Sequence, residues 1–148
     1  MILSIIIFFG PQFYINQTIF VKIKIPLIMN TSLNVYGQPL ENCSCDPMTG
    51  YFRDGFCNTT LDDSGTHVVC AIVTNEFLEY SLKKGNDLIT PRPNWNFPGL
   101  KAGDKWCLCV SRWKEAEKAN VAPKIDLNAT HQLALEYVSL ELLQQYSI

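Results

Sequence analysis

The chain has 148 residues, of which 47% are apolar and 18% charged, and its formal net charge is −2. This length suits one domain with a hydrophobic core of its own. So small a charge, with no run of Lys or Arg, excludes a strongly basic nucleic-acid-binding surface, and no segment recurs at the fixed period of a solenoid.

Residues 1–28 are dominated by Ile and Phe and differ from the rest of the chain. No Lys or Arg precedes the first apolar run and no small-residue cleavage site follows it, so the marks of a secretory signal are missing. Pro11, Asn16 and their polar neighbours interrupt the run, which makes a lipid-facing helix costly. We interpret residues 1–28 as an apolar leader or a mis-assigned upstream extension, favour the extension, and predict a single domain over residues 29–148.

The first part of this domain is rich in turn-forming residues. The stretches DPMTG, RDGF and LDDSG, within residues 30–65, carry Asp and Gly residues typical of turns, and the first also carries a Pro. We expect a short extended piece over residues 34–37 and a hairpin turn at Asp54-Gly55, with loops dominating the rest. The pattern predicts a loop-rich cap that belongs to the same domain.

A strand and a helix follow. Residues 66–73 are almost all apolar, which indicates a strand buried on both faces. Thr74 is placed to cap a helix over residues 75–84. The apolar stripe expected on this helix consists of Phe77, Leu78 and Leu82.

The remaining elements are short. Residues 86–100 hold three prolines and cannot form a regular helix or a central strand. The expected order after them is a central strand over 105–112, a helix over 112–119, an edge strand over 124–127, one or two helical turns over 129–136, and a helix from the Ser139 cap to Tyr146. This mixed order predicts an α+β fold: a single compact domain with a small mixed or antiparallel sheet, a few short helices and the loop-rich cap.

The stretch KWCLCVSRW, residues 105–113, organises the predicted fold. Strand alternation places Trp106, Leu108 and Val110 on one face and the thiols of Cys107 and Cys109 on the other. Two thiols on one face can begin a tetrahedral zinc site but cannot complete it. The cap and the C-terminal segment would supply the rest, so the predicted metal ligands are Cys43, Cys57, Cys107, Cys109 and His131.

Two alternatives to the zinc site remain open. The cysteines can pack as small apolar residues, as we expect for Cys70 in its buried strand. Alternatively, a strained and easily reduced bond between Cys107 and Cys109 would serve thiol redox chemistry. Nucleophilic catalysis by a cysteine with His67 or His131 is formally possible but has no local sequence signature.

Polar and aromatic side chains on the predicted loops indicate a small-ligand pocket, because binding residues concentrate on loops. Arg53 or Arg92 could hold a carboxylate or phosphate with its planar guanidinium group. The alternative is that these residues have only structural roles, forming turns or packing against their neighbours. Nucleotide-binding glycine loops, zincin helices and hydrolase elbows are missing from the sequence. The candidates are His67, Arg53 and Asp54 for catalysis, and Asn86, Asp87, Arg92 and Trp95 for ligand binding.

The six cysteines are even in number, but a chain of this length does not need disulfides to close its core. Reduced thiols and a cytoplasmic location are therefore expected. N-glycosylation sequons favour the alternative, a secreted or membrane-anchored protein with residues 1–28 as its leader. The sequons lie at Asn16, Asn30, Asn42, Asn58 and Asn128.

The stretches NVYGQPLE, DPMTGYFRDGFC, GNDLITPRP, FPGLKAGDKWCLC and ATH stand in this order from Asn34 onward. In these the chain resembles the uncharacterised bacterial and eukaryotic proteins grouped as domain of unknown function 2237 (DUF2237). The resemblance implies a soluble intracellular domain and brings no activity, substrate or cofactor with it. It also implies that Cys45 departs from the family pattern, whereas Cys43, Cys57, Cys70, Cys107 and Cys109 match it.

Together these patterns predict an uncharacterised domain that binds a small ligand or a metal ion, most plausibly zinc, at a Cys-lined site. The alternatives are an enzyme that uses the polar loop pocket and a thiol redox protein. We expect no nucleic-acid partner and no membrane contact of the domain itself. The oligomeric state and the reaction, if there is one, are left open by the sequence.

Overall fold

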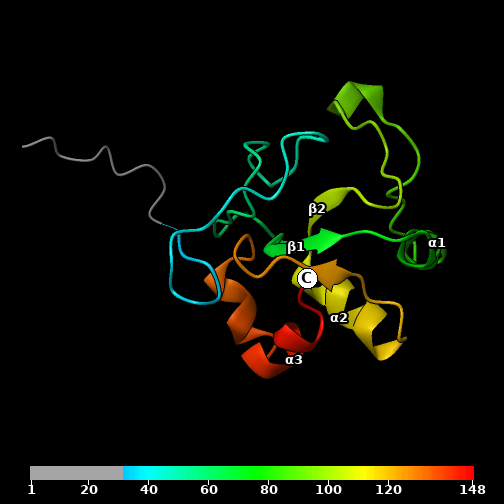
Figure 1. Ribbon diagram of the computed structural model, residues 1–148. Coiled ribbons are helices and arrows are strands. Elements are labelled where there is room, and N and C mark those ends of the chain that lie inside the picture. The colour runs from blue at the N-terminus through cyan, green and yellow to red at the C-terminus, as the bar shows by residue number, and fades with distance from the viewer. Residues whose placement is uncertain (1–31) are drawn as a thin grey trace, which may run out of the picture.

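The computed structural model describes residues 32–148, so the expectations for residues 1–28 lie outside it. Within this range the α+β prediction is confirmed, with three α-helices and a three-stranded antiparallel sheet. In Figure 1, α2 and α3 lie together below the sheet. In chain order the elements are β1 (Val69–Ile72), α1 (Asn75–Lys83), the 3-10 helix η1 (Pro93–Trp95), β2 (Lys105–Leu108), α2 (Val110–Lys118), β3 (Lys124–Ile125), the 3-10 helix η2 (Gln132–Glu136) and α3 (Leu140–Gln145).

The sheet order is β2-β1-β3, so β1 is central and β2 is an edge strand. This corrects the prediction of a central strand over residues 105–112. The strand ends at Leu108, and α2 begins at Val110. Val110, Trp113 and Ala116 are all buried at helical spacing, and this helical period prevails over the strand-like alternation. As a result, Cys109 is not in the strand but at the N-cap position of α2.

The first helix agrees with its predicted start but not with its predicted stripe. The Thr74 hydroxyl caps α1 by accepting a hydrogen bond from the Phe77 N–H at 3.1 Å. Leu82 is 46% exposed, whereas Ser81 is buried. The Ser81 hydroxyl donates to the Asn86 carbonyl at 2.9 Å and accepts from the Asn86 side-chain amide at 3.0 Å. Ser81 is therefore buried against the chain that leaves the helix, and the Leu82 side chain faces the solvent.

Replacing Thr74 by alanine is expected to lower the free energy of unfolding by about 1 kcal/mol, because the first turn of α1 loses its side-chain acceptor. Urea unfolding measures this difference. Thr74→Ser keeps the hydroxyl and serves as the matched control, with an expected change of a few tenths of a kcal/mol. Equal loss in both variants would mean that the methyl group, not the cap, stabilises this position.

The predicted C-terminal helix is confirmed. The Ser139 hydroxyl accepts from the Leu142 N–H at 3.3 Å, and α3 ends beside Tyr146. Leu143 is fully buried, and Tyr146 packs edge-on against Trp113 of α2, with ring centroids 5.1 Å apart. The predicted helical turns over residues 129–136 are the 3-10 helix η2. These contacts fix α2 and α3 to each other under the sheet.

Four cysteines form two disulfides, Cys43–Cys70 and Cys57–Cys107. The expectation of reduced thiols is therefore wrong for these four. Cys70 and Cys107 stand directly opposite each other on β1 and β2, and each bonds to one cysteine of the loop-rich cap. With Ala129 the four form a small buried cluster, separate from the main core. The two bonds thus attach the cap to the sheet.

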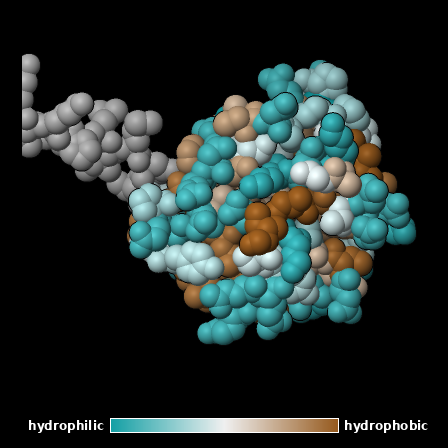
Figure 2. Space-filling view, in the orientation of Figure 1, coloured by the Kyte–Doolittle hydropathy of each residue, from teal (hydrophilic) through white to brown (hydrophobic). Residues whose placement is uncertain are grey.

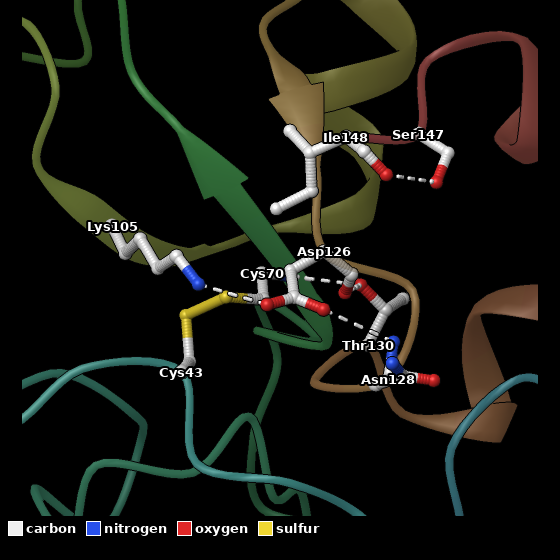
Figure 3. A network of polar contacts seen from close by, with 8 residues as sticks. All are labelled: Cys43, Cys70, Lys105, Asp126, Asn128, Thr130, Ser147 and Ile148. Atoms are coloured by element: carbon white, nitrogen blue, oxygen red, sulfur yellow. Dashed lines mark hydrogen bonds and ion pairs between the residues drawn. A yellow bond between two sulfur atoms is a disulfide. The ribbon is translucent and has the colours of Figure 1, made fainter.

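Figure 3 shows the first disulfide beside a network of polar contacts. The Thr130 hydroxyl accepts from the Cys70 N–H at 3.1 Å and donates to the Asp126 carbonyl at 2.7 Å. Lys105 of β2 pairs with the Asp126 carboxylate at 2.8 Å. These contacts satisfy polar groups around the Cys43–Cys70 bond and tie β2 to the segment after β3.

None of the helices between residues 32 and 148 has the length and apolar character needed to cross a bilayer. The face drawn in Figure 2 is mostly hydrophilic, with one elongated hydrophobic patch near its centre.

Candidate functional site

The loop before β1 carries Asp63 and His67, and a strained residue sets their positions. Thr66 has a φ of 50°, a left-handed conformation that is rare for a β-branched residue and costs about 1–3 kcal/mol. Its N–H donates to the Asp63 carbonyl at 2.9 Å, and its carbonyl accepts from the Val110 N–H at 3.1 Å. This turn therefore holds His67 beside the N-terminus of α2, where Cys109 is the N-cap residue.

Asp63 holds the imidazole ring of His67 from one side. Its Oδ1 lies 2.6 Å from His67 Nδ1, and its Oδ2 accepts from the His67 backbone N–H at 2.8 Å and from Thr59 Oγ1 at 3.1 Å. The Asp63 side chain has no exposed area, and burial alone raises its pKa, but these hydrogen bonds and the charge of His67 lower the pKa overall. Asp63 is thus an ionised orienting group, which leaves Nε2 as the available nitrogen of His67.

Cys109 interacts with the same ring. A hydrogen bond with Cys109 raises the pKa of His67, burial opposes it, and the charges of Cys109 and Asp63 add to it, so that the pKa reaches about 9 instead of 6.5. Cys109 is a free thiol of intermediate exposure. A methyl group at Gly65 would lie 3.0 Å from the Cys109 sulfur and overlap the His67 ring. Glycine at this position lets the loop lie against both groups.

The fold is expected to lose stability as the pH rises from about 6.5 to about 9. The pKa of His67 is raised to about 9 in the folded state, so its proton stabilises the fold fully below pH 6.5, and this contribution disappears as the pH passes through 9. Urea unfolding at a series of pH values measures the slope. His67→Gln should remove this slope between pH 6.5 and 9, and an unchanged slope would contradict the pKa assigned to His67.

A cavity of about 290 Å³ opens beside His67. The rings of Tyr51 and His67 stack there, with centroids 6.4 Å apart. Six of the predicted site residues line this cavity: Cys107 comes from β2, and the other five come from three separate loops. Its lining consists of Gly50, Tyr51, Arg53, His67, Asp87, Leu88, Arg92, Trp95, Phe97, Trp106 and Cys107.

Six predicted site residues lie outside this lining: the predicted ligands Cys43, Cys57 and Cys109, of which Cys109 lies beside His67, and three others that make local hydrogen bonds. Asp54 accepts from the Phe56 N–H at 3.0 Å and shapes its own turn. Asn86 binds Ser81 at the end of α1. His131 caps η2 by accepting from the Leu133 N–H at 3.0 Å, and burial lowers its pKa. For each of the three, the local hydrogen bonding corresponds to a structural role.

The predicted metal ligands separate into different places. The sulfurs of Cys43, Cys57 and Cys70 lie within 4.8 Å of one another and, if reduced, could hold a metal ion. In the structure these sulfurs are in disulfides. Cys70, expected to be a plain core residue, belongs to this cluster, whereas Cys109 and His131 do not. The expected placement of Cys107 and Cys109 on one face of a strand is wrong, because the strand ends at Leu108 and Cys109 is the N-cap residue of α2.

Asp63 is the residue that sequence reasoning missed. It stands in the LDDSG turn, where an aspartate is expected for turn formation alone. A signal was present, because Asp63 and His67 are four residues apart with a glycine between them. The contact with Cys109 has no such local signal, since it depends on how the loop packs against α2.

Residues 33–147 match a family model described as "Uncharacterized protein conserved in bacteria (DUF2237)". A search of curated proteins found no match.

Proposed function

Since the chain belongs to the DUF2237 family, we propose its function from the site itself: a thiol-dependent enzyme in which Cys109 is the nucleophile. His67 serves as acid and base, and Asp63 orients its ring. The reaction class that suits this set is acyl transfer to water from a small substrate bound in the adjacent cavity. The observation that carries the proposal is that one imidazole is hydrogen-bonded to a buried carboxylate and lies next to a free thiol, both ring and sulfur being close to Gly65.

The steps follow from the roles of these three groups. Cys109 gives its proton to His67 and its sulfur attacks the substrate's carbonyl carbon, so that an S–C bond forms and the C=O π pair moves to oxygen. When the pair returns, the bond to the leaving group breaks, and His67 donates the proton to that group. Water then attacks the thioester, with His67 taking a proton from it, and Cys109 leaves as the thiol. The N-terminus of α2 stabilises negative charge at the sulfur and at the carbonyl oxygen.

The reactivity of Cys109 tests this proposal without knowledge of the substrate. An imidazolium next to a sulfur favours the thiolate, so Cys109 should react with iodoacetamide at pH 6.5 at least about tenfold faster than Cys45. Cys45 is exposed and also free, and it provides an internal control in the same molecule. Mass spectrometry of the labelled peptides gives both rates. Slower or equal labelling of Cys109, with the disulfides intact, would overturn the proposal.

The sulfur cluster supports a second candidate, a zinc site in the reduced protein. Cys43, Cys57 and Cys70 meet in one place, and Cys107 is bonded to Cys57, so reduction would free four neighbouring thiols. Reduced protein should then bind one Zn²⁺ per chain, measured by metal analysis after gel filtration. Cys70→Ser should weaken this binding at least about tenfold, whereas Cys45→Ser should not change it. Loss of zinc from the reduced wild-type protein on the column would exclude this candidate.

The cellular location decides which of these states is populated, and cytoplasmic remains a prediction. Disulfides persist in oxidising compartments and are rare in the cytosol. Thiol trapping in freshly lysed native cells, followed by peptide mass spectrometry, separates the two states. Cys43 and Cys70 modified by the trapping reagent were reduced in the cell, which would support the cytoplasmic prediction. An intact disulfide between them would favour export.

A further inference from the structure

We infer that the cavity beside His67 selects small organic anions with a flat apolar body, and that Arg53 and Arg92 bind the anionic group. This inference rests on the proposed function for the direction in which the substrate lies. The carbonyl group would lie at His67, beside Cys109, and a carboxylate or phosphate would lie toward the arginines.

Arg53 is fixed in place but retains binding capacity. Its backbone has a φ of 55°, its NH1 donates to the Met48 carbonyl at 3.1 Å, and its guanidinium lies 5.0 Å from the ring centre of Trp106. Among residues 32–148, no carboxylate lies within ion-pair distance of it. A guanidinium has five N–H donors, so Arg53 can still bind an anion with the others.

Arg92 is held in a similar way by the opposite loop. Its guanidinium lies 5.4 Å from the ring centre of Trp95, which is 68% exposed. Its ion pair with Asp87 is long, at 3.6 Å. Asp87 Oδ1 accepts from the N–H groups of Ile89 and Thr90 at 3.0 and 2.9 Å, so that carboxylate is mainly occupied with its own loop. The Arg92 fork therefore keeps most of its capacity for a ligand.

The charges of the cavity lining favour an anion. Arg53 and Arg92 are guanidinium cations and Asp87 is the single carboxylate in the lining, while Asp63, 2.6 Å from the His67 ring, balances the charge of His67. Low dielectric walls strengthen this field at the bound ligand. A neutral or cationic substrate would leave the excess positive charge uncompensated.

The walls between these charges are flat and apolar. Tyr51 stacks against His67, and Trp106 packs against Phe97 with ring centroids 5.4 Å apart. Leu88 completes the apolar part of the lining. Pockets for small molecules combine such surfaces with a few polar groups that fix orientation, and a cavity of about 290 Å³ admits a body of roughly one aromatic ring.

Ligand protection of Cys109 tests the inference. Benzoate and phenyl phosphate should slow the iodoacetamide labelling of Cys109 in a saturable way and leave Cys45 unaffected, whereas the neutral benzyl alcohol and inorganic phosphate alone should protect at least about tenfold less well. Arg53→Gln and Arg92→Gln should each raise the half-protecting concentration about tenfold or more, because a charge-assisted hydrogen bond is lost. Lys83→Gln, on α1, is the control for loss of one positive charge and should leave the protection unchanged.

Tryptophan fluorescence of the Cys109→Ser variant separates this inference from the proposed function. Trp95 and Trp106 line the cavity, so benzoate or phenyl phosphate should change the emission without any reaction at the thiol. Fast labelling of Cys109 without protection or fluorescence change would overturn the anion selectivity alone. Slow labelling of Cys109 together with a saturable fluorescence change would overturn the thiol chemistry and keep the anion site.

Discussion

Removing the Cys57–Cys107 disulfide by the double substitution Cys57→Ala/Cys107→Ala is expected to lower the free energy of unfolding by about 4 kcal/mol. The bond joins residues 50 positions apart and so restricts a long loop of the unfolded chain. It also holds the loop-rich cap, which has few regular elements of its own, against β2. Urea unfolding under non-reducing conditions measures the effect, with both proteins at the same pH.

The Cys43–Cys70 bond closes a shorter loop, with a separation of 27 residues, and its removal should cost slightly less. Cys45→Ser is the matched control, because Cys45 is exposed and free, and its replacement should change the free energy of unfolding by less than about 0.5 kcal/mol. A loss below about 1 kcal/mol for the Cys57/Cys107 double variant would mean that the cap is held by its other contacts and that the disulfide is dispensable.

Asp63→Asn is expected to slow the labelling of Cys109 by iodoacetamide about tenfold to hundredfold at pH 6.5. The carboxylate fixes the ring of His67 through Nδ1 and contributes to its raised pKa. With an uncharged amide in its place, the imidazolium is less favoured and the ring is less well oriented. The plot of the Cys109 labelling rate against pH is therefore expected to change in shape, and the rates themselves are expected to fall.

The shape of this pH profile separates positioning from general destabilisation. A purely structural effect would lower the unfolding free energy and leave the pH dependence of labelling unchanged. Asp62→Asn is the matched control, since Asp62 is the exposed neighbour with the same chemistry. If Asp63→Asn and Asp62→Asn label at the wild-type rate with the wild-type profile, Asp63 has no part in the site.

Local features of the sequence predicted much of the fold. The caps at Thr74 and Ser139 and the helices that follow them depend on hydrogen bonds within one turn, and these are visible in the order of residues. The prolines of residues 86–100 likewise excluded a regular helix or a central strand, and the turn residues of the cap indicated that loops dominate it. Residues 109–112 were wrongly predicted as strand because their sequence fits both the two-residue period of a strand and the 3.6-residue period of a helix. Burial of Trp113 decided for the helix.

The candidate site was predicted only in its loop residues. Arg53, Arg92 and Trp95 stood out because such side chains on loops bind ligands. The grouping of Asp63, His67 and Cys109 was not predicted, because it depends on the contact between the Thr66 turn and α2.

By itself, the sequence determined the fold class, the loop-rich cap, the helix starts and the family. Those properties follow from local hydrogen bonding, residue periodicity and motif order. Only the tertiary structure decided which cysteines bond and which thiol stays free. Antiparallel pairing sets Cys70 opposite Cys107 and directs both toward the cap, while the start of α2 turns Cys109 toward His67. The physical reason is that strand register and helix start are settled by packing between distant segments, which local residue patterns do not encode.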